Sequence, residues 1–314
     1  MSLTTLNLTI NNYSLVSEYW GRGLGDGLAK NTSLTTLSLT LNNCIVMSED
    51  WVGALGDGLA KNTSLTTLSL TLNNCIVVSE DWEHGLSNGL AKNTSLTTLS
   101  LTINNYSNMR EDWAHGLSNG LAKNTSLTTL SLTINNYSNM SEDWAHGLSN
   151  GLAKNTSLTT FSLTVNIYSF MIGDWAHGLD EALQSTTTVF ISEDWACGLG
   201  DGLGKNTSLT TLKLTVNNYS DMSGDWAHSL GDGLAINTSI TCLNFVVTNS
   251  SEVSEDWLNY LCDCLVKSDS LTSLRFTIND HSGSSKVLCK CLADLKSLTS
   301  LSLTVTLYGE ASVC

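Results

Sequence analysis

The sequence predicts an α/β solenoid in which short parallel strands line a concave face and short helices line the convex face. Two observations lead to this fold class. The 314-residue chain repeats one segment of 31 residues many times, and repeats of this period are typical of solenoids. Within each segment the spacing of apolar residues changes from two, typical of a strand, to four, typical of a helix. We therefore expect residues 1–314 to form a single curved array with no separate catalytic domain.

The repeat is seen most easily by aligning the phrase SLTTL and its variants. This phrase starts at Ser2, Ser33, Ser64, Ser95, Ser126 and Ser157, and again at Ser208, Ser239 and Ser270, with a partial unit at Ser297. Residues 187–207 resemble the second half of a unit but lack the leucine-rich first half. We therefore expect about ten units, with one shortened unit at 187–207.

The first half of each unit predicts a short strand. Its leucines follow the pattern L-x-x-L-x-L, which in the unit that begins at Ser126 is formed by Leu127, Leu130 and Leu132. Residues two apart lie on the same face of a strand, so Leu130 and Leu132 are expected to face the core. The residues beside them, which are Thr129, Ser131 and Thr133, are then expected on the opposite, concave face.

The second half of each unit predicts a short helix. Trp144, Leu148 and Leu152 recur at intervals of four and form one apolar stripe. Ser141 is a typical N-cap, and Asn155 is expected to end the helix in the left-handed conformation. Two internal glycines weaken such a helix by about 1 kcal/mol each relative to alanine, which leaves room for irregular or 3₁₀ turns in some units.

The pattern L-x-x-L-x-L-x-x-N, with one strand and one helix per unit, resembles the leucine-rich repeat (LRR) of the ribonuclease-inhibitor-like subtype. The phrase NTSLTTLSL is also similar to the LRR arrays of animal NACHT/LRR (NOD-like) receptors. This resemblance implies a cytoplasmic array for innate immune sensing or regulation, which binds a protein partner through its concave face or loops. The nucleotide-binding motif G-x-x-x-x-G-K-[ST] of those receptors is absent from the sequence. The resemblance therefore implies the array without its N-terminal nucleotide-binding module.

Composition argues against several other classes of function. The chain has 14 basic and 29 acidic residues and a net charge of -15, whereas nucleic acids and anionic membranes attract clustered lysine and arginine. It has no run of about 18 apolar residues that would span a membrane. Its nine cysteines are an odd number and are expected to be reduced thiols of an intracellular protein.

Many Asn-x-Ser/Thr triplets occur, and most stand at one position of the repeat. They include Asn31, Asn62, Asn93, Asn124, Asn155, Asn206 and Asn237. In a secreted protein these would be glycosylation sites. Because glycans at one repeat position would crowd along one edge of the array, we interpret these asparagines first as turn residues.

Two sets of residues could suggest metal binding. One is a column of histidines at a single repeat position, namely His84, His115, His146, His177 and His228. The other is two aligned C-x-C pairs, Cys262 with Cys264 and Cys289 with Cys291. Neighbouring helices lie about 8–10 Å apart, too far for one column to share an ion, and residues two apart on a helix face different ways. We expect no metal or cofactor, although a disulfide or metal at the cysteines stays an alternative. No arrangement typical of an active site is found, so we expect no enzyme.

The concave face is the candidate site for binding a partner. Its central row reads serine in most units but changes to Lys213, Asn244 and Arg275 in three consecutive units late in the chain. These residues predict a short polar and basic track that would contact an acidic protein or ligand. The alternative interpretation is that they are surface substitutions that affect only solubility. Two other interpretations of the repeats are a structural or ice-binding-like surface of threonine ladders and an unselected gene fragment.

Overall fold

The computed structural model describes most of the chain, and the statements below concern those residues alone. They are residues 2–11, 15–16, 18–43, 46–47, 49–75, 80–105, 112–136, 143–167, 193–218, 226–249, 256–280 and 295–307.

Strands and helices alternate along the chain. The main strands are β1 (Thr5–Asn11), β3 (Thr36–Asn42), β5 (Thr67–Asn73), β6 (Thr98–Asn105), β7 (Thr129–Asn136), β8 (Thr160–Ile167), β9 (Thr211–Asn218), β10 (Cys242–Asn249), β11 (Ser273–Asp280) and β12 (Ser300–Leu307). The helices are α1 (Glu18–Lys30), α2 (Glu49–Lys61), α3 (Glu80–Lys92), α4 (Asp112–Lys123), α5 (Asp143–Lys154), α6 (Glu193–Lys205), α7 (Trp226–Ile236) and α8 (Asp256–Lys267). Two short strands, β2 (Leu15–Val16) and β4 (Val46–Met47), pair with each other in parallel.

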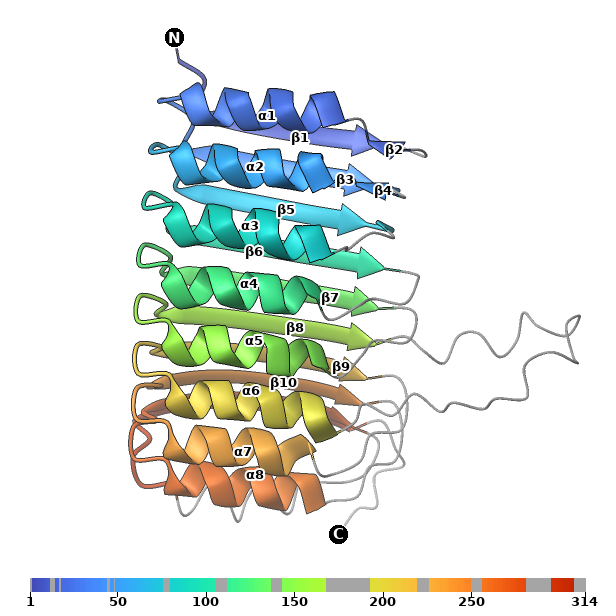
Figure 1. The fold of residues 1–314 in the computed structure, drawn as a ribbon. Helices are drawn as coiled ribbons and strands as arrows, with labels where there is room; N and C mark the ends of the chain where they lie inside the picture. Colours follow the sequence, from blue (N-terminus) through green and yellow to red (C-terminus); the bar gives the residue numbers. More distant parts are fainter. Residues whose placement is uncertain are drawn as a thin grey trace, which may run out of the picture.

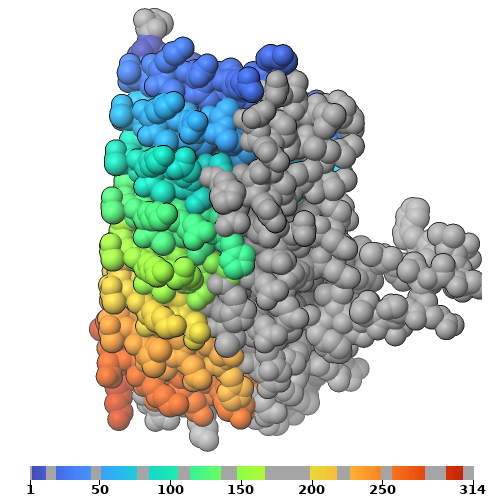
Figure 2. Space-filling view, viewed as in Figure 1, coloured from blue at the N-terminus to red at the C-terminus, as the bar shows by residue number. Residues whose placement is uncertain are grey.

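The main strands form one parallel sheet of ten strands in the order β1-β3-β5-β6-β7-β8-β9-β10-β11-β12. Leu37 pairs with Leu68, 31 residues later, and Leu68 with Leu99. The helices form a single layer over one face of the sheet, and the stack of helices is taller than the stack of strands behind it (Figure 1). The sheet therefore lies on the concave side, which confirms the predicted solenoid of leucine-rich-repeat type. Figure 2 shows the convex face, where the helices follow one another as bands in sequence order.

The core lies between the sheet and the helices. In β3 the residues alternate between buried and half-buried, because successive side chains of a strand point to opposite faces. The buried set of β3 is Leu37, Leu39 and Leu41, each exposed by at most 1%. On the helix side, Leu148 and Leu152 of the predicted stripe are also buried. The side chain of Trp144 and the predicted N-cap Ser141 lie outside the described residues.

The shortened unit contributes a helix but no strand to the described stack. Its second half forms α6, which packs between α5 and α7. Strand β8 pairs directly with β9, so that Leu163 lies beside Leu214, 51 residues later. Residues 168–192, which include the start of the predicted shortened unit, lie outside the described residues.

The glycines inside the helices allow neighbouring helices to come into contact. The described helices are regular α-helices of 11–13 residues, so the suggestion of irregular or 3₁₀ turns in some units was wrong for them. An added Cβ at Gly56 of α2 would overlap the carbonyl oxygen of Gly85 in α3. At Gly151 an added Cβ would lie 2.6 Å from the Ser118 carbonyl oxygen. The loss of helix propensity at these glycines is offset by close packing between units.

In six successive units of the sheet, one asparagine joins the unit to the preceding one. The side chain of Asn62 is 2% exposed and donates from Nδ2 to the carbonyl oxygens of Leu28 (2.7 Å) and Asn31 (3.1 Å). Its Oδ1 accepts from the backbone N–H groups of Ser64 (3.0 Å) and Leu65 (2.7 Å). We call this set of four bonds the asparagine clamp. It recurs at Asn93, Asn124, Asn155, Asn206 and Asn237.

The clamp corrects the expectation that Asn155 ends its helix in the left-handed conformation. Among the described residues other than glycine, only Asn43 and Asn74 have a positive φ, of 55° and 51°. The backbone N–H of Asn155 still bonds the carbonyl oxygen of Gly151 (3.0 Å). The chain turns after it because Oδ1 of Asn155 holds the next backbone N–H groups, as a side-chain-mediated turn does.

The length and the apolar character of the helices bear on whether they could span a membrane. Within the described residues, no helix combines the length and the apolar character needed to cross a bilayer.

We expect Gly56→Ala to lower the free energy of unfolding by about 1–3 kcal/mol, because the new methyl group overlaps backbone of α3. Gly53→Ala in the same helix is the matched control, since nothing lies within 4 Å of a Cβ there. That change should raise stability by up to about 1 kcal/mol through helix propensity. Urea or thermal unfolding followed by circular dichroism measures both. Equal stabilisation by the two substitutions would contradict the proposed helix contact.

We expect Asn93→Ala to destabilise the array by about 3 kcal/mol, because it removes the four bonds of the clamp and leaves the N–H groups of Ser95 and Leu96 without their acceptor. The carbonyl oxygens of Leu59 and Asn62 keep one longer bond each, from Asn62 N–H and Ser95 Oγ. The control is Asn88→Ala on the preceding helix, where the asparagine is exposed and the change should be within about 0.5 kcal/mol of neutral. Denaturant unfolding measures the difference. A loss at Asn93 no larger than that at Asn88 would rule out the clamp as a main source of stability.

Candidate functional site

The face of the sheet that the helices leave uncovered carries four rows of side chains. In β7 these outward residues are Thr129, Ser131, Thr133 and Asn135, all half-buried. Thr129 lies beside Thr98 and Thr160, and Ser131 beside Ser100 and Ser162. The equal spacing of the units therefore produces continuous rows of threonine and serine, as the sequence predicted.

The fourth row is an asparagine ladder that the sequence analysis did not anticipate. Asn42 donates from Nδ2 to Oδ1 of Asn11 (2.6 Å), and Asn73 donates in the same way to Asn42 (2.6 Å). The ladder continues through Asn104, Asn135, Asn166 and Asn217. Because each amide bonds the next one, part of the hydrogen-bonding capacity of this row is taken up within the ladder.

Strands β9, β10 and β11 interrupt these uniform rows. The register pairs Lys213 with Asn244 and Asn244 with Arg275, so the three predicted residues are direct neighbours. They are flanked by Ser162 on β8 and Ser302 on β12. We call Lys213, Asn244 and Arg275 the basic track. The other predicted residues, Thr129, Ser131 and Thr133, lie on the same face two strands away, on β7.

The charged residues described on the concave face belong to the basic track. Among the described outward positions of the ten main strands, only Lys213 and Arg275 are charged, and both are exposed. None of the 29 acidic residues of the chain occupies such a position. Neighbouring strands lie about 4.8 Å apart, so these two side chains start about 10 Å from each other. Among the described outward positions, an acidic group that reaches this face therefore meets two cations and no anion.

Asn244 has a polar atom that the fold does not satisfy. Its Oδ1 is buried and makes no hydrogen bond with any described residue. A buried acceptor without a partner costs about 1–3 kcal/mol. On the same strand, Val246 lies where both neighbouring strands carry threonine, and Cys242 lies where they carry threonine or serine. The departure from the repeat is therefore greatest on β10, in the middle of the track.

The structure describes only part of the histidine column and one of the two cysteine pairs. His115 is exposed and His228 half-buried, while the side chains of His84 and His146, and the whole of His177, lie outside the described residues. Cys262 and Cys264 are buried; Cys289 and Cys291 are not described. Burial raises the pKa of the Cys264 thiol, and the nearby carboxylate of Asp232 raises it further. Within the described chain, no three His, Cys, Asp or Glu side chains gather as a metal site would require.

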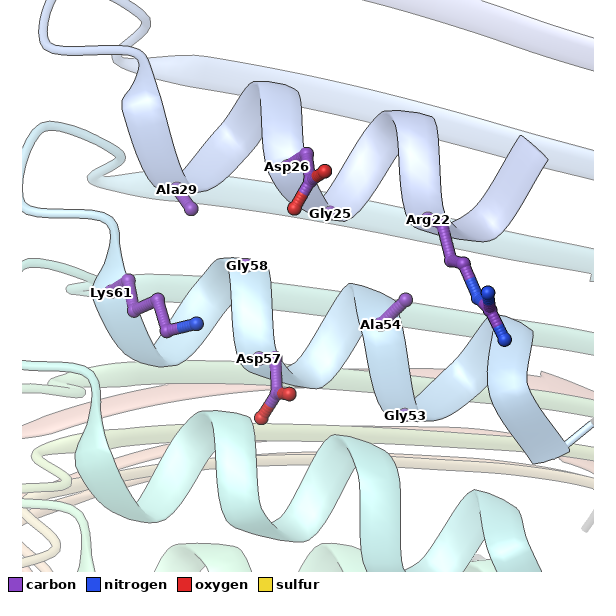
Figure 3. Close-up of a pocket in the computed structure, with 9 residues that line it drawn as sticks. All are labelled: Arg22, Gly25, Asp26, Ala29, Gly53, Ala54, Asp57, Gly58 and Lys61. Atoms are coloured by element: carbon purple, nitrogen blue, oxygen red, sulfur yellow. The ribbon is translucent and has the colours of Figure 1, made fainter. Parts of the chain in front are cut away.

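A shallow depression on the convex face was also not foreseen. It has a volume of about 440 Å³ and lies between α1 and α2, where glycines bring the helices together. Figure 3 shows Arg22 and Asp26 of α1 and Lys61 of α2 around it, with Asp57 turned toward the next helix. A similar depression lies between α6 and α7. The two follow from the repeated glycine contacts, and their lining mixes both signs of charge.

Comparison with known proteins assigns no family to the chain. No family model and no curated protein matches the chain. Among solved structures it is similar to actin-binding site 2 of leiomodin-1, with 18% identity over 47% of this chain and 81% of that chain, and a TM-score of 0.32. It is also similar to a chain of the Toll–Spatzle complex of Drosophila, with 11% identity over 97% of this chain and a TM-score of 0.41. This chain spans 37% of that one. What those proteins bind is a property of those proteins.

We expect Asn244→Ser to raise the free energy of unfolding by about 1 kcal/mol, because serine restores the residue of the row and removes the unsatisfied amide oxygen. The reciprocal control is Ser131→Asn on β7, which places an amide in the same row away from the cations and should give no gain. Urea unfolding measures both variants. A destabilised Asn244→Ser protein would show that the amide is already satisfied.

Proposed function

We propose that this chain is a non-enzymatic, protein-binding scaffold that holds an acidic segment of a partner across β9, β10 and β11. The observation that carries the proposal is the distribution of charge on the concave face. A molecule of net charge -15 presents there two exposed cations in register and no anion. Charge complementarity of this kind gives an interface its specificity and orientation.

The spacing of the basic track suggests the form of the partner. Lys213 and Arg275 are two strands apart, or about 10 Å. A peptide in polyproline II conformation advances about 3.1 Å per residue with three residues per turn, so acidic residues at positions i and i+3 lie on the same side, about 9 Å apart, and match this distance. The flanking serines and threonines supply hydroxyl groups to the peptide backbone. We therefore propose a partner segment of the type Glu-x-x-Glu in polyproline II conformation.

The resemblance of NTSLTTLSL to NOD-like receptor arrays supports a more specific proposal. In that class the array would serve as the sensing or regulatory part of a cytoplasmic innate immune receptor, or of a fragment of one, joined to an N-terminal nucleotide-binding module. A reading frame upstream of Met1 that encodes G-x-x-x-x-G-K-[ST] would support this assignment. An upstream secretion signal in the same frame would contradict it.

The double variant Lys213→Glu with Arg275→Glu tests the basic track. The probe is a labelled peptide that contains Glu-x-x-Glu in a sequence that favours polyproline II conformation, with a Gln-x-x-Gln peptide as the control ligand. We expect the variant to bind the acidic peptide at least about tenfold more weakly than the parent chain, a loss of about 1.4 kcal/mol. Fluorescence anisotropy at one fixed ionic strength measures the affinity.

A matched variant separates the track from net charge. Lys92→Glu with Lys123→Glu makes the same change of charge at exposed helix ends on the convex side. This control should alter peptide affinity by less than about twofold if the contact is local, since exposed charges farther away than a Debye length of about 8–10 Å are screened. Equal affinities of both double variants and the parent chain would remove the track from consideration. Thermal unfolding confirms that both variants fold.

A further inference from the structure

The clamp asparagines also match the sequence motif for N-linked glycosylation. Asn62, Asn93, Asn124, Asn155, Asn206 and Asn237 each begin an Asn-Thr-Ser triplet. Such triplets receive N-linked glycans in the secretory pathway. The sequence alone left open whether glycosylation and this fold are compatible at these positions.

The atom that would carry the glycan is the atom that binds the preceding unit. In each of the six residues Nδ2 donates to a leucine carbonyl oxygen at 2.6–2.7 Å. It donates a second time to the carbonyl oxygen of the preceding unit's own triplet asparagine, at 2.9–3.2 Å. The six side chains are only 1–2% exposed. Both N–H groups of the amide are therefore in use, and solvent does not reach them.

Glycosyl transfer would destroy this arrangement. In that reaction Nδ2 forms a bond to the anomeric carbon of a lipid-pyrophosphate-linked oligosaccharide, the bond from that carbon to the pyrophosphate oxygen breaks, and Nδ2 loses one proton. The product has one N–H in place of two and carries a sugar at a buried atom. One clamp bond is lost, and the sugar would occupy the space of the preceding unit's backbone.

Asn31 shows the same triplet without the clamp. Its Oδ1 accepts from the N–H groups of Ser33 (2.9 Å) and Leu34 (2.6 Å), as in the other units. Its side chain is only half-buried, and no hydrogen bond from its Nδ2 is found to any described residue. A glycan on Asn31 would therefore displace nothing that the structure describes.

We infer that folding of this chain and N-glycosylation at the six clamp asparagines exclude each other, whereas in the 314-residue chain Asn31 serves as a control triplet without clamp bonds. Each of the six units that carry the clamp can stack only while its asparagine is unmodified. A compartment without N-glycosylation, such as the cytoplasm expected from the sequence, suits this fold.

Purified, unglycosylated chain tests accessibility directly. It is incubated with a single-subunit oligosaccharyltransferase and a lipid-linked oligosaccharide, beside synthetic peptides that span each triplet. Site-resolved glycopeptide mass spectrometry reads the occupancy. We expect all seven peptides to be glycosylated, while the folded chain accepts a glycan at Asn31 and at least about a hundredfold more slowly at the other six, because transfer there requires local opening. A clamp asparagine in the folded chain that reacts as fast as its peptide overturns the inference.

A second arm tests whether a glycan prevents folding. The chain is directed to the secretory pathway by an added signal, and the protease-resistant, monodisperse fraction is separated from the protease-sensitive one. Glycans on the six clamp asparagines should be confined to the sensitive fraction, with Asn31 occupied in both. Protease-resistant molecules with a glycan at any of the six would show that the clamp is dispensable and would refute the exclusion.

Discussion

The rest of this structure depends on a buried asparagine side chain that bonds two units at once. Nδ2 of Asn62 reaches back to Leu28 and Asn31, while its Oδ1 turns the chain into the next strand. An amide with two donors and two acceptors is fully satisfied only when the units stack at one separation and in one register. The strand pairing and the leucine core both follow from that register. The clamp also explains how the array passes the shortened unit, since Asn206 bonds Leu152 and Asn155 just as Asn62 bonds Leu28 and Asn31.

The sequence analysis predicted the strand and the helix within a unit, but it missed the contacts that join neighbouring units. The two periods of the leucines gave the strand, the helix and the buried stripe correctly. Asn155 was interpreted as a local helix stop because its partners Leu121 and Asn124 are 34 and 31 residues away. Gly151 was interpreted in the same local way, as a weakness of its own helix, although a Cβ added there would meet Ser118 of the preceding helix. Helix and turn propensities depend on residues that are close in the sequence. The roles of these asparagines and glycines depend instead on contacts with the adjacent unit.

The candidate site was predictable to the extent that it depends on register. Equal spacing of the units was enough to align Lys213, Asn244 and Arg275, and the structure places them on adjacent strands. The buried Oδ1 of Asn244 was not predictable, because it depends on side-chain packing among neighbouring strands. The asparagine ladder was missed for a related reason: the consensus asparagine was treated as part of a motif rather than as one of the outward residues of its strand.

The repeat itself limits where such a site can arise. Leucines, clamp asparagines and helix glycines touch the adjacent unit, so a change at one of them disturbs two units. The outward strand positions face solvent, and a charged side chain there costs little. The 29 acidic residues found in other parts of the molecule increase the contrast in charge between this face and the rest of the surface. The two cations lie about 10 Å apart, which is close to the Debye length at physiological salt. Acids beyond the helix layer are screened at that range, while both cations act together on one bound segment. The proposed acidic segment would therefore be attracted where β9, β10 and β11 carry the basic track, with little effect from the distant acidic residues.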